Sequence, residues 1–343
     1  MKRLSFIAAV ALSLLSFSVT AADSLPRPDG KEADMSKPVQ VYILMGQSNM
    51  LTFGKKAMLE AACKEGKYPY LVDDSGNWTV RKDVRNIQVM GSGDGASKTL
   101  KNEWMTVSGN IGVEMGIGHH LGQATDAPVM ILKSAIGNRS LGWDLLPPGS
   151  PRYTFEGEEQ PGYKETIKGK KDKTIVPFVK GGDCLQWYAG LQYDGDVRRA
   201  KEVLDSLSKF YPGATKFEVA GFFWWQGDKD FRNKAHAAKY EENLVNLIKA
   251  LRKDFNAPNA KFVIATLGQT KKDADGTLGQ ILNAKMAVAD PAKYPDHKGN
   301  VATVYTNPVI KGGSSSGHYS GNAETYMNVG ELMGAAMVDL IKK

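Results

Sequence analysis

The sequence predicts an α/β fold, a three-layer α/β/α sandwich with a central parallel sheet. Apolar runs rich in Val and Ile alternate along the chain with stretches whose apolar residues recur three and four positions apart. The first pattern is typical of strands buried on both faces, and the second of helices that bury one stripe. Their alternation indicates a parallel sheet with helices on both sides. A hydrophobic content of 42% over 343 residues excludes whole-chain disorder and allows one large domain.

The chain begins with the pattern of a secretory signal peptide over residues 1–21. Two basic residues precede an apolar run from Leu4 to Val19, and small residues follow it. This order predicts a cleaved leader and an exported protein, periplasmic or extracellular. No later run reaches the ~20 apolar residues of a membrane span, so no span is expected. A polar lead over 22–38 then precedes a single predicted domain over 39–343.

Six strands are expected in this domain, at Val39–Met45, Asn86–Met90, Pro128–Lys133, Phe217–Trp224, Lys261–Leu267 and Val301–Tyr305. Four helices are expected, at Ile111–Leu121, Val197–Phe210, Tyr240–Phe255 and Tyr326–Ile341. Residues 55–104 and 144–191 are rich in turn residues, and both stretches are predicted as long loops. Loops that follow the carboxyl ends of strands line the ligand crevice of an open α/β sheet.

The charge balance makes nucleic acid an unexpected partner. Removal of the leader lowers the formal charge from +7 to +5, because it removes two basic residues and no acid. Apart from the run Lys164–Lys173, the basic residues are spread along the chain without interleaved aromatics. A mild attraction to acidic glycans is compatible with this surplus.

The cysteine content does not indicate a metal centre. Cys63 and Cys184 lie far apart, with no histidine at metal-ligand spacing, so no zinc site is predicted. A disulfide is possible in an exported protein, and two unpaired thiols are the alternative.

The clearest chemical signal is Ser48, in the string Met45-Gly46-Gln47-Ser48-Asn49-Met50 directly after the first strand. A serine at a strand-to-helix turn lies at the sheet edge beside helix N-terminal amides, which stabilise a developing negative charge. Gly46 permits the sharp turn. The alternative interpretation is that Ser48 only caps the next helix.

His318 lies in a Gly/Ser loop immediately before the last helix, near the edge where Ser48 is expected. A lone loop histidine is usually a solvent-exposed bystander. Together with a serine after the first strand, it has the arrangement of a general base beside a nucleophile.

Two more strand ends carry candidate site residues. Gly137, in the segment Ser134–Ser140, could present a backbone amide to an oxyanion, and the Gln226 carboxamide could be a second donor. Trp225 could offer a face on which a sugar stacks. A satisfied polar turn is the alternative for the residues after Trp225.

Together these residues resemble the sialate O-acetylesterase branch of the SGNH hydrolases, close to the carbohydrate esterases that deacetylate xylan. The resemblance extends from about Val39 to Leu340 and rests on the strings 46–50, 134–141 and 225–230 and on His318. It implies an SGNH (flavodoxin-like) hydrolase fold and no metal or organic cofactor. It further implies Ser48 as nucleophile and His318 as general base. The oxyanion hole would combine the Ser48 and Gly137 amides with the Gln226 side chain, and Gln47, Asn138 and Trp225 would contact an acetylated carbohydrate substrate.

Two departures from the family pattern leave the acid of the catalytic triad open. Ser315 stands where the family places an aspartate three residues before the histidine, and Asp228 replaces the usual glutamate after Gln-Gly. His318 could be oriented by Asp228, which we take as the third catalytic residue, by a backbone carbonyl, or by Asp296. His297 is the next candidate base.

The segment Gly313–Gly317 matches G-x-S-x-G, but it lacks the preceding strand and the helix immediately after it that a nucleophile elbow requires. We therefore interpret this segment as a mobile loop that presents the catalytic histidine.

The expected function is that of a secreted serine esterase that removes O-acetyl groups from carbohydrates through an acyl-enzyme. A lipase, thioesterase or arylesterase of the same superfamily is one alternative. A glycan-binding protein on a degenerate esterase scaffold is another, motivated by the missing acid at Ser315.

Overall fold

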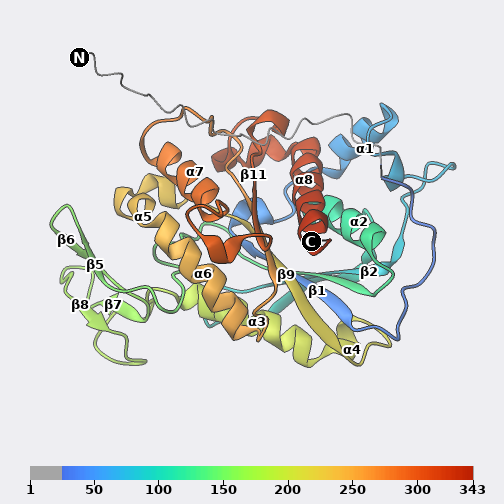
Figure 1. The fold of residues 1–343 in the computed structure, drawn as a ribbon. Helices are drawn as coiled ribbons and strands as arrows, with labels where there is room; N and C mark the ends of the chain where they lie inside the picture. Colours follow the sequence, from blue (N-terminus) through green and yellow to red (C-terminus); the bar gives the residue numbers. More distant parts are fainter. Residues whose placement is uncertain (1–24, 343) are drawn as a thin grey trace, which may run out of the picture.

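The computed structural model describes residues 25–342, so the predicted leader over 1–21 lies outside the described residues. A seven-stranded sheet in the order β11-β10-β9-β1-β4-β2-β3 forms the centre, with helices on both faces (Figure 1). All neighbouring strands are parallel except β2 and β3. The predicted α/β/α sandwich is therefore confirmed, with one antiparallel edge strand. The strands are β1 (Val39–Gly46), β2 (Arg81–Met90), β3 (Lys98–Met105), β4 (Val129–Ser134), β9 (Phe217–Trp225), β10 (Lys261–Ala265) and β11 (Val301–Val304).

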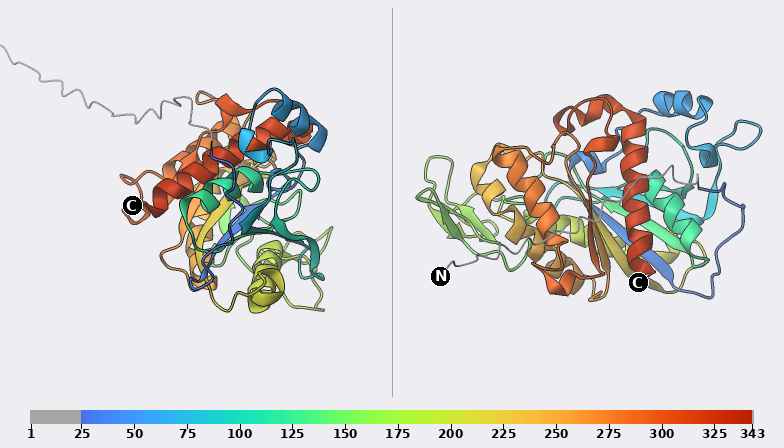
Figure 2. Two further views of the ribbon diagram at one scale, coloured as in Figure 1. Left: turned by 90° about the vertical axis from the view of Figure 1, so that its right-hand side faces the viewer. Right: turned by 45° about the horizontal axis from the view of Figure 1, so that its top comes forward.

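The helices divide between the two faces of the sheet (Figure 2). One face is covered by α3 (Leu191–Asp205), α4 (Leu207–Phe210), α6 (Tyr240–Asp254) and α7 (Gly276–Val288), with the short α5 (Lys234–Ala238) beside them. The other face is covered by α1 (Lys56–Lys64), α2 (Glu114–Ala124) and α8 (Ala323–Ile341). Of these helices, the sequence pattern had not predicted α1, α5 and α7.

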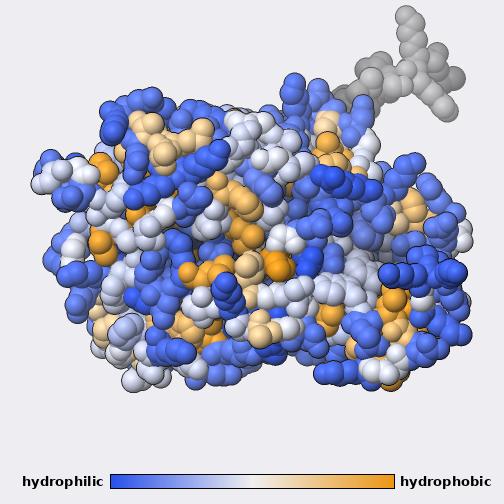
Figure 3. Space-filling view, turned by 180° about the vertical axis from the view of Figure 1, so that it is seen from behind, coloured by the Kyte–Doolittle hydropathy of each residue, from blue (hydrophilic) through white to orange (hydrophobic). Residues whose placement is uncertain are grey.

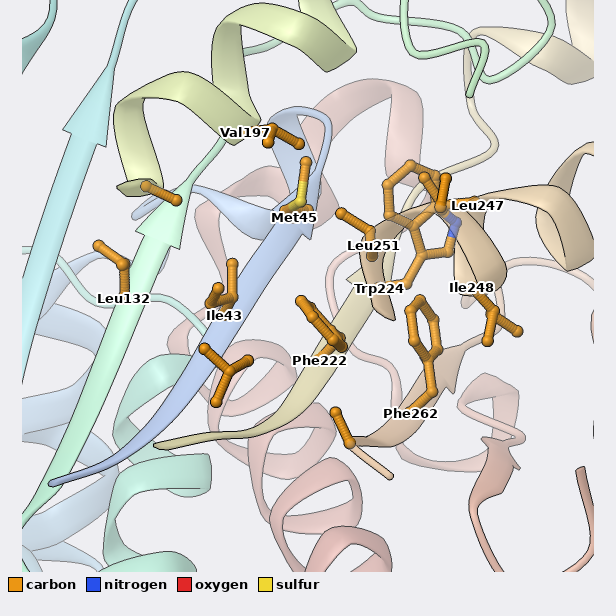
Figure 4. Packing of buried hydrophobic residues seen from close by; sticks show 14 of the residues in the cluster. Ile43, Met45, Leu132, Val197, Phe222, Trp224, Leu247, Ile248, Leu251 and Phe262 are labelled. Atoms are coloured by element: carbon orange, nitrogen blue, oxygen red, sulfur yellow. The ribbon is translucent and has the colours of Figure 1, made fainter. Parts of the chain in front are cut away.

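The central strands bury both of their faces, which explains their nearly continuous apolar sequences. In β1, Ile43 and Met45 point toward α3 and α6, whereas Tyr42 and Leu44 point toward α2 and α8. Figure 4 shows the first of these layers, where side chains from β1, β4, β9 and β10 pack against Leu247 and other residues of α6. This core fixes the strand ends that carry the candidate site.

The two predicted long loops have more regular structure than expected. Residues 55–104 contain α1 and two strands of the main sheet, so the prediction of a loop there was wrong. Residues 144–191 contain two small antiparallel hairpins, which project from the body beside α5 and α6 (Figure 1). Their strands are β5 (Tyr153–Phe155), β6 (Glu158–Gln160), β7 (Glu165–Ile167) and β8 (Ile175–Pro177).

The described residues also show the state of the two cysteines and whether a helix could span a membrane. Cys63 and Cys184 are both unpaired thiols, and burial raises the pKa of Cys63 to about 11. No helix within residues 25–342 is long and apolar enough to cross a bilayer. The face seen in Figure 3 is mainly hydrophilic, with small apolar patches scattered over it.

Candidate active site

Ser48 lies at the carboxyl end of β1, in a turn that only glycine permits. Gly46, the last residue of the strand, has φ of 149°, and a Cβ there would lie 2.5 Å from the carbonyl oxygen of Trp225. This close approach brings the end of β9 against the turn. The helix predicted after the strand is a single 3-10 turn, η1 (Ser48–Met50), and Ser48 itself is buried to 8% exposure.

The backbone of Gly137 lies against Ser48. A Cβ on Gly137, in the loop after β4, would lie only 3.3 Å from the Ser48 Cβ. Within residues 25–342, neither the Ser48 N–H nor the Gly137 N–H donates to another backbone carbonyl. Asn138 is exposed directly after Gly137, with φ of 57°. The loop therefore places the Gly137 backbone and the exposed Asn138 side chain near Ser48, and the roles expected of them toward an oxyanion and a substrate stay predictions.

Asp230 ties the loop after β4 to the loop after β9. Its two carboxylate oxygens accept the N–H groups of Leu141 at 2.9 Å and Gly142 at 2.8 Å, and the Gln226 side chain also donates to it. Burial raises the pKa of Asp230, and His236 at 3.9 Å opposes that shift. Asp230 therefore fixes the loop that carries Gly137, a role that sequence reasoning did not assign.

Gln226 has a structural role rather than the predicted role of oxyanion donor. The side chain is fully buried, and its amide nitrogen, with two N–H groups, lies within hydrogen-bond distance of three acceptors: Asp230, the Arg139 carbonyl at 2.9 Å and Gln47 Oε1 at 3.2 Å. Its own oxygen accepts the Tyr240 hydroxyl at 2.9 Å. Because both polar atoms of the carboxamide have protein partners, it holds the loops together and has no free N–H for an oxyanion.

Two predicted substrate-binding residues are also part of the core. Trp225 has no exposed surface, stacks on Tyr319 with ring centroids 5.6 Å apart, and donates to the Thr266 carbonyl. Gln47 is 2% exposed, and its side-chain oxygen accepts the Lys229 N–H at 3.1 Å. The predicted sugar contacts of Trp225 and Gln47 are therefore wrong for this structure.

His318 is presented by a strained turn, η6 (Ser315–Gly321), that runs into the last helix. His318, Tyr319 and Ser320 have positive φ values of 50°, 52° and 56°. A non-glycine residue in this conformation costs about 1–2 kcal/mol, and such strain often accompanies functional sites. Tyr319 stabilises the turn, since its side chain is fully buried and its hydroxyl accepts the Gly268 N–H at 3.1 Å.

The His318 ring is held by an aromatic stack. It lies parallel to the Phe53 ring, with centroids 4.0 Å apart and an angle of 1° between the planes. The Lys55 N–H donates to the Gly321 carbonyl at 2.9 Å, which joins the two loops directly, and η6 also lies against η1. Among the described residues the imidazole makes no hydrogen bond to Ser48 or to a carboxylate. Phe53 therefore sets the orientation of the ring.

Asp228 does not contact the His318 ring. Its carboxylate accepts the hydroxyls of Ser315 and Ser316, both at 2.7 Å, and lies 3.3 Å from Arg232. These contacts hold the segment before His318 and leave the predicted triad acid without its expected partner. Residues 315–317 of the segment 313–317 lie in this turn, which leads directly to His318, and no strand immediately precedes the segment, so it is no nucleophile elbow.

The other candidate acid and base lie at the wrong edge of the sheet. Asp296 and His297 precede β11, whereas Ser48 follows β1, and the parallel strands place these positions at opposite edges. The His297 ring is hydrogen-bonded to the Val288 carbonyl at 2.7 Å. Neither residue can act on Ser48.

A buried ion pair supports the loop that carries Phe53. Lys133 on β4 and Glu114 on α2 are 2.6 Å apart, and both side chains are 1% exposed. Glu114 also accepts the Gly112 N–H at 2.9 Å, and the neighbouring Ile111 exchanges two backbone hydrogen bonds with Gly54. Each charge interrupts an otherwise apolar stretch of sequence, and that signal predicts a buried partner.

A buried lysine also holds the strand ends. The Lys285 ammonium donates to the carbonyl oxygens of Gln226 and Ala265, at the ends of β9 and β10. Burial lowers the pKa of Lys285 to about 7.

The likeness to solved structures concerns the fold. A carbohydrate acetylesterase from Xanthomonas citri superposes with a TM-score of 0.51 at 14% identity, over 87% of this chain and 55% of the other. A protein from Arabidopsis thaliana gives a TM-score of 0.49 at 15% identity, over 88% and 98% of the two chains. NanS superposes with a TM-score of 0.39 at 14% identity, over 78% of each chain.

The comparison of sequences identifies the family. No curated protein is significantly similar to the chain in sequence. Residues 162–339 match the family described as carbohydrate esterase, sialic acid-specific acetylesterase. The match contains Asp228 and His318, whereas Ser48 precedes it. Because it spans more than half of the 343 residues, the chain belongs to this family of carbohydrate esterases.

Proposed function

We propose that the protein removes O-acetyl groups from carbohydrates, with Ser48 as nucleophile and His318 as general base. The observation that carries this proposal is the turn after β1, where Gly137 lies against Ser48, with room for a Cβ only 3.3 Å from the Ser48 Cβ, and where neither N–H donates to a backbone carbonyl of the described residues. Preorganised amides at such a position stabilise the oxyanion of a tetrahedral intermediate. Membership of the carbohydrate esterase family supports this chemistry.

In the proposed reaction the Ser48 Oγ attacks the acetyl carbonyl carbon while the His318 imidazole accepts its proton. The carbonyl oxygen becomes an oxyanion that accepts hydrogen bonds from the Ser48 and Gly137 amides. Collapse of the intermediate breaks the bond to the sugar oxygen, which takes the proton from the imidazolium. A water molecule, deprotonated by His318, then attacks the acetyl-serine, and acetate leaves with Ser48 restored.

We infer that Ser48 and His318 act as a dyad, with Phe53 in the orienting role that an acid has in a triad. The parallel stack of Phe53 and His318 and the contacts of Asp228 with Ser315 support this assignment. Catalytic hydrogen bonds are often long before substrate binds, so the proton transfer requires the imidazole to close on Ser48 in the complex.

The test measures acetate release from acetylated xylan, acetylated sialosides and p-nitrophenyl acetate by the wild-type protein and by Ser48→Ala and His318→Ala. A serine-directed fluorophosphonate followed by peptide mass spectrometry should label Ser48. Acetate release that both variants lose supports the proposal. Hydrolysis of p-nitrophenyl acetate without acetate release from either glycan would assign an esterase of another class, and glycan binding without hydrolysis would assign a binding protein.

A further inference from the structure

The basic surplus of the chain is concentrated in one segment outside the site. Residues 164–180 contain six lysines and two acids, a surplus of +4, compared with +7 for the whole sequence. The segment comprises Lys164, β7, the turn after it, β8 and the three residues that follow. We call it the basic hairpin. It belongs to the pair of hairpins that project from the body in Figure 1.

The cations of the basic hairpin have few partners. Both acids are occupied, Glu165 by Arg152 at 2.7 Å and Asp172 by Lys168 at 3.7 Å. Four other lysines of the hairpin are exposed and form no ion pair with any residue of the described chain, namely Lys170, Lys171, Lys173 and Lys180. Unpaired exposed ammonium groups that lie close together attract a polyanion.

The base of the basic hairpin is attached to the wall of the candidate site. Thr166 on β7 donates to the carbonyl oxygen of Trp187 at 3.0 Å. The ring of Trp187 lies under the Arg139 guanidinium at 4.9 Å, and Arg139 is two residues after Gly137. The turn begins after Ile167, and at ~3.3 Å per residue its lysines extend roughly 10–13 Å further. The hairpin therefore extends from the same wall that carries Arg139 and Gly137, so a long substrate chain that passes Ser48 along this wall would meet it.

We propose that the basic hairpin binds an acidic polysaccharide and thereby delivers the acetyl esters of that polymer to Ser48. This inference rests on the proposed esterase function and specifies its substrate as an anionic polymer. Flexible, strongly hydrated lysines suit a diffuse chain of carboxylates better than one tightly held ligand. The hairpin has a single aromatic residue, Phe178, which packs on Tyr188 at 4.4 Å, so the stacking platform of a single-strand nucleic-acid site is missing from it.

The experiment compares a charge-reversal variant, Lys170→Glu/Lys171→Glu/Lys173→Glu, with a control of equal charge change. The control reverses three exposed lysines elsewhere on the chain that form no ion pair with described residues, Lys82→Glu/Lys216→Glu/Lys298→Glu. Substrates are acetylated polygalacturonate, neutral acetylated xylan and p-nitrophenyl acetate, at low and high salt. Polygalacturonate without acetyl groups serves as competitive inhibitor and reports binding directly.

We expect the hairpin variant to raise KM for acetylated polygalacturonate about 10-fold with kcat unchanged, because several weak ion pairs are lost together. Inhibition by polygalacturonate should weaken equally, and high salt should abolish the difference between the proteins. The two small or neutral substrates should change less than about 2-fold. The control variant should retain a KM for the acidic polymer close to that of the wild-type protein.

Several results would overturn the inference. One is an equal rise of KM in the control variant, which would indicate net charge alone. Another is hairpin-dependent binding to duplex DNA or to phosphatidylglycerol vesicles without binding to polygalacturonate. If p-nitrophenyl acetate is hydrolysed through Ser48 but polygalacturonate neither binds nor inhibits, the inference fails and the proposed esterase remains. If Ser48→Ala retains that hydrolysis, the proposed function itself fails.

Discussion

Replacement of Phe53 by leucine tests how His318, the proposed general base, is held. The Phe53 ring lies parallel to the His318 imidazole at 4.0 Å, and within the described residues no hydrogen bond to a carboxylate orients that imidazole. Leucine keeps an apolar contact of similar volume but removes the flat face. The imidazole would then sample orientations that do not reach the Ser48 hydroxyl.

The expected loss can be derived from the stack itself. An aromatic pair contributes about 0.5–1.5 kcal/mol beyond the burial of its area. At 1.4 kcal/mol for each factor of ten, the correctly oriented population falls roughly 2- to 12-fold. We expect kcat to fall by this factor with KM unchanged, since Phe53 acts on the base. Because the Phe53 side chain is 36% exposed, the melting temperature should change little.

The assay is hydrolysis of p-nitrophenyl acetate under saturating conditions, with thermal unfolding measured in parallel. Phe53→Tyr retains a flat ring and should retain most of kcat. Phe217→Leu is the matched control, because Phe217 is similarly exposed, at 41%, but lies at the start of β9, away from the carboxyl ends of the strands that carry the candidate site. A wild-type kcat in Phe53→Leu, or an equal loss in Phe53→Leu and Phe53→Tyr, would refute the orienting role of the stack.

Three further predictions concern the proposed nucleophile Ser48, the carboxylate of Asp228 and the buried ion pair of Glu114 and Lys133. Ser48→Ala should lose several orders of magnitude in ester hydrolysis with an unchanged far-ultraviolet circular dichroism spectrum. Asp228→Asn should lose less than about 10-fold in kcat, whereas an aspartate that orients the histidine of a triad contributes ~10⁴-fold; a loss of that size would restore the triad. Glu114→Gln should cost about 3–5 kcal/mol in urea unfolding at pH 7, because it leaves Lys133 buried and uncompensated, against about 0–1 kcal/mol for Glu202→Gln in an exposed pair. Burial alone would raise the pKa of Glu114, but the charge of Lys133 outweighs burial and holds that pKa below 4.5. The stabilisation by the ion pair should therefore be present above pH 4.5 and be lost as the pH falls through the pKa of Glu114 in the folded protein.

The strands that lie in the middle of the sheet were predictable because burial on both faces requires a nearly continuous apolar sequence. The apolar run at Val39–Met45 became β1 with nearly the same bounds. The first half of β2 has no apolar run, because it contains Arg85, which is buried and donates a hydrogen bond to the distant Phe210 carbonyl. In α7, Lys285 faces the core and disturbs the apolar stripe that would have indicated a helix.

The same distinction applies to the candidate site. Strand order brings the ends of β1 and β4 together, so the proximity of Ser48 and Gly137 followed from topology and from the two glycines. The orientation of the Gln226 side chain did not follow from topology, because one of its acceptors is the carbonyl of Arg139, 87 residues away. A sequence shows which polar side chains end a strand, but their partners in the fold decide which of them face a substrate.

Ser315 occupies the position of the expected acid and contacts Asp228, and this contact gives a final prediction. The Ser315 hydroxyl is 2.7 Å from the Asp228 carboxylate and the side chain is buried, so an aspartate at 315 would place two carboxylates together. Two like charges ~4 Å apart repel by about 4 kcal/mol at an effective dielectric constant of 20, and the repulsion raises one pKa. Ser315→Asp should therefore lower both kcat and the melting temperature at pH 7, and the melting temperature should recover toward pH 5 as one carboxyl becomes protonated. Thermal unfolding and kinetics at both pH values measure this, and a gain of activity at pH 7 with unchanged stability would show that His318 lacks an acid and that position 315 can supply it.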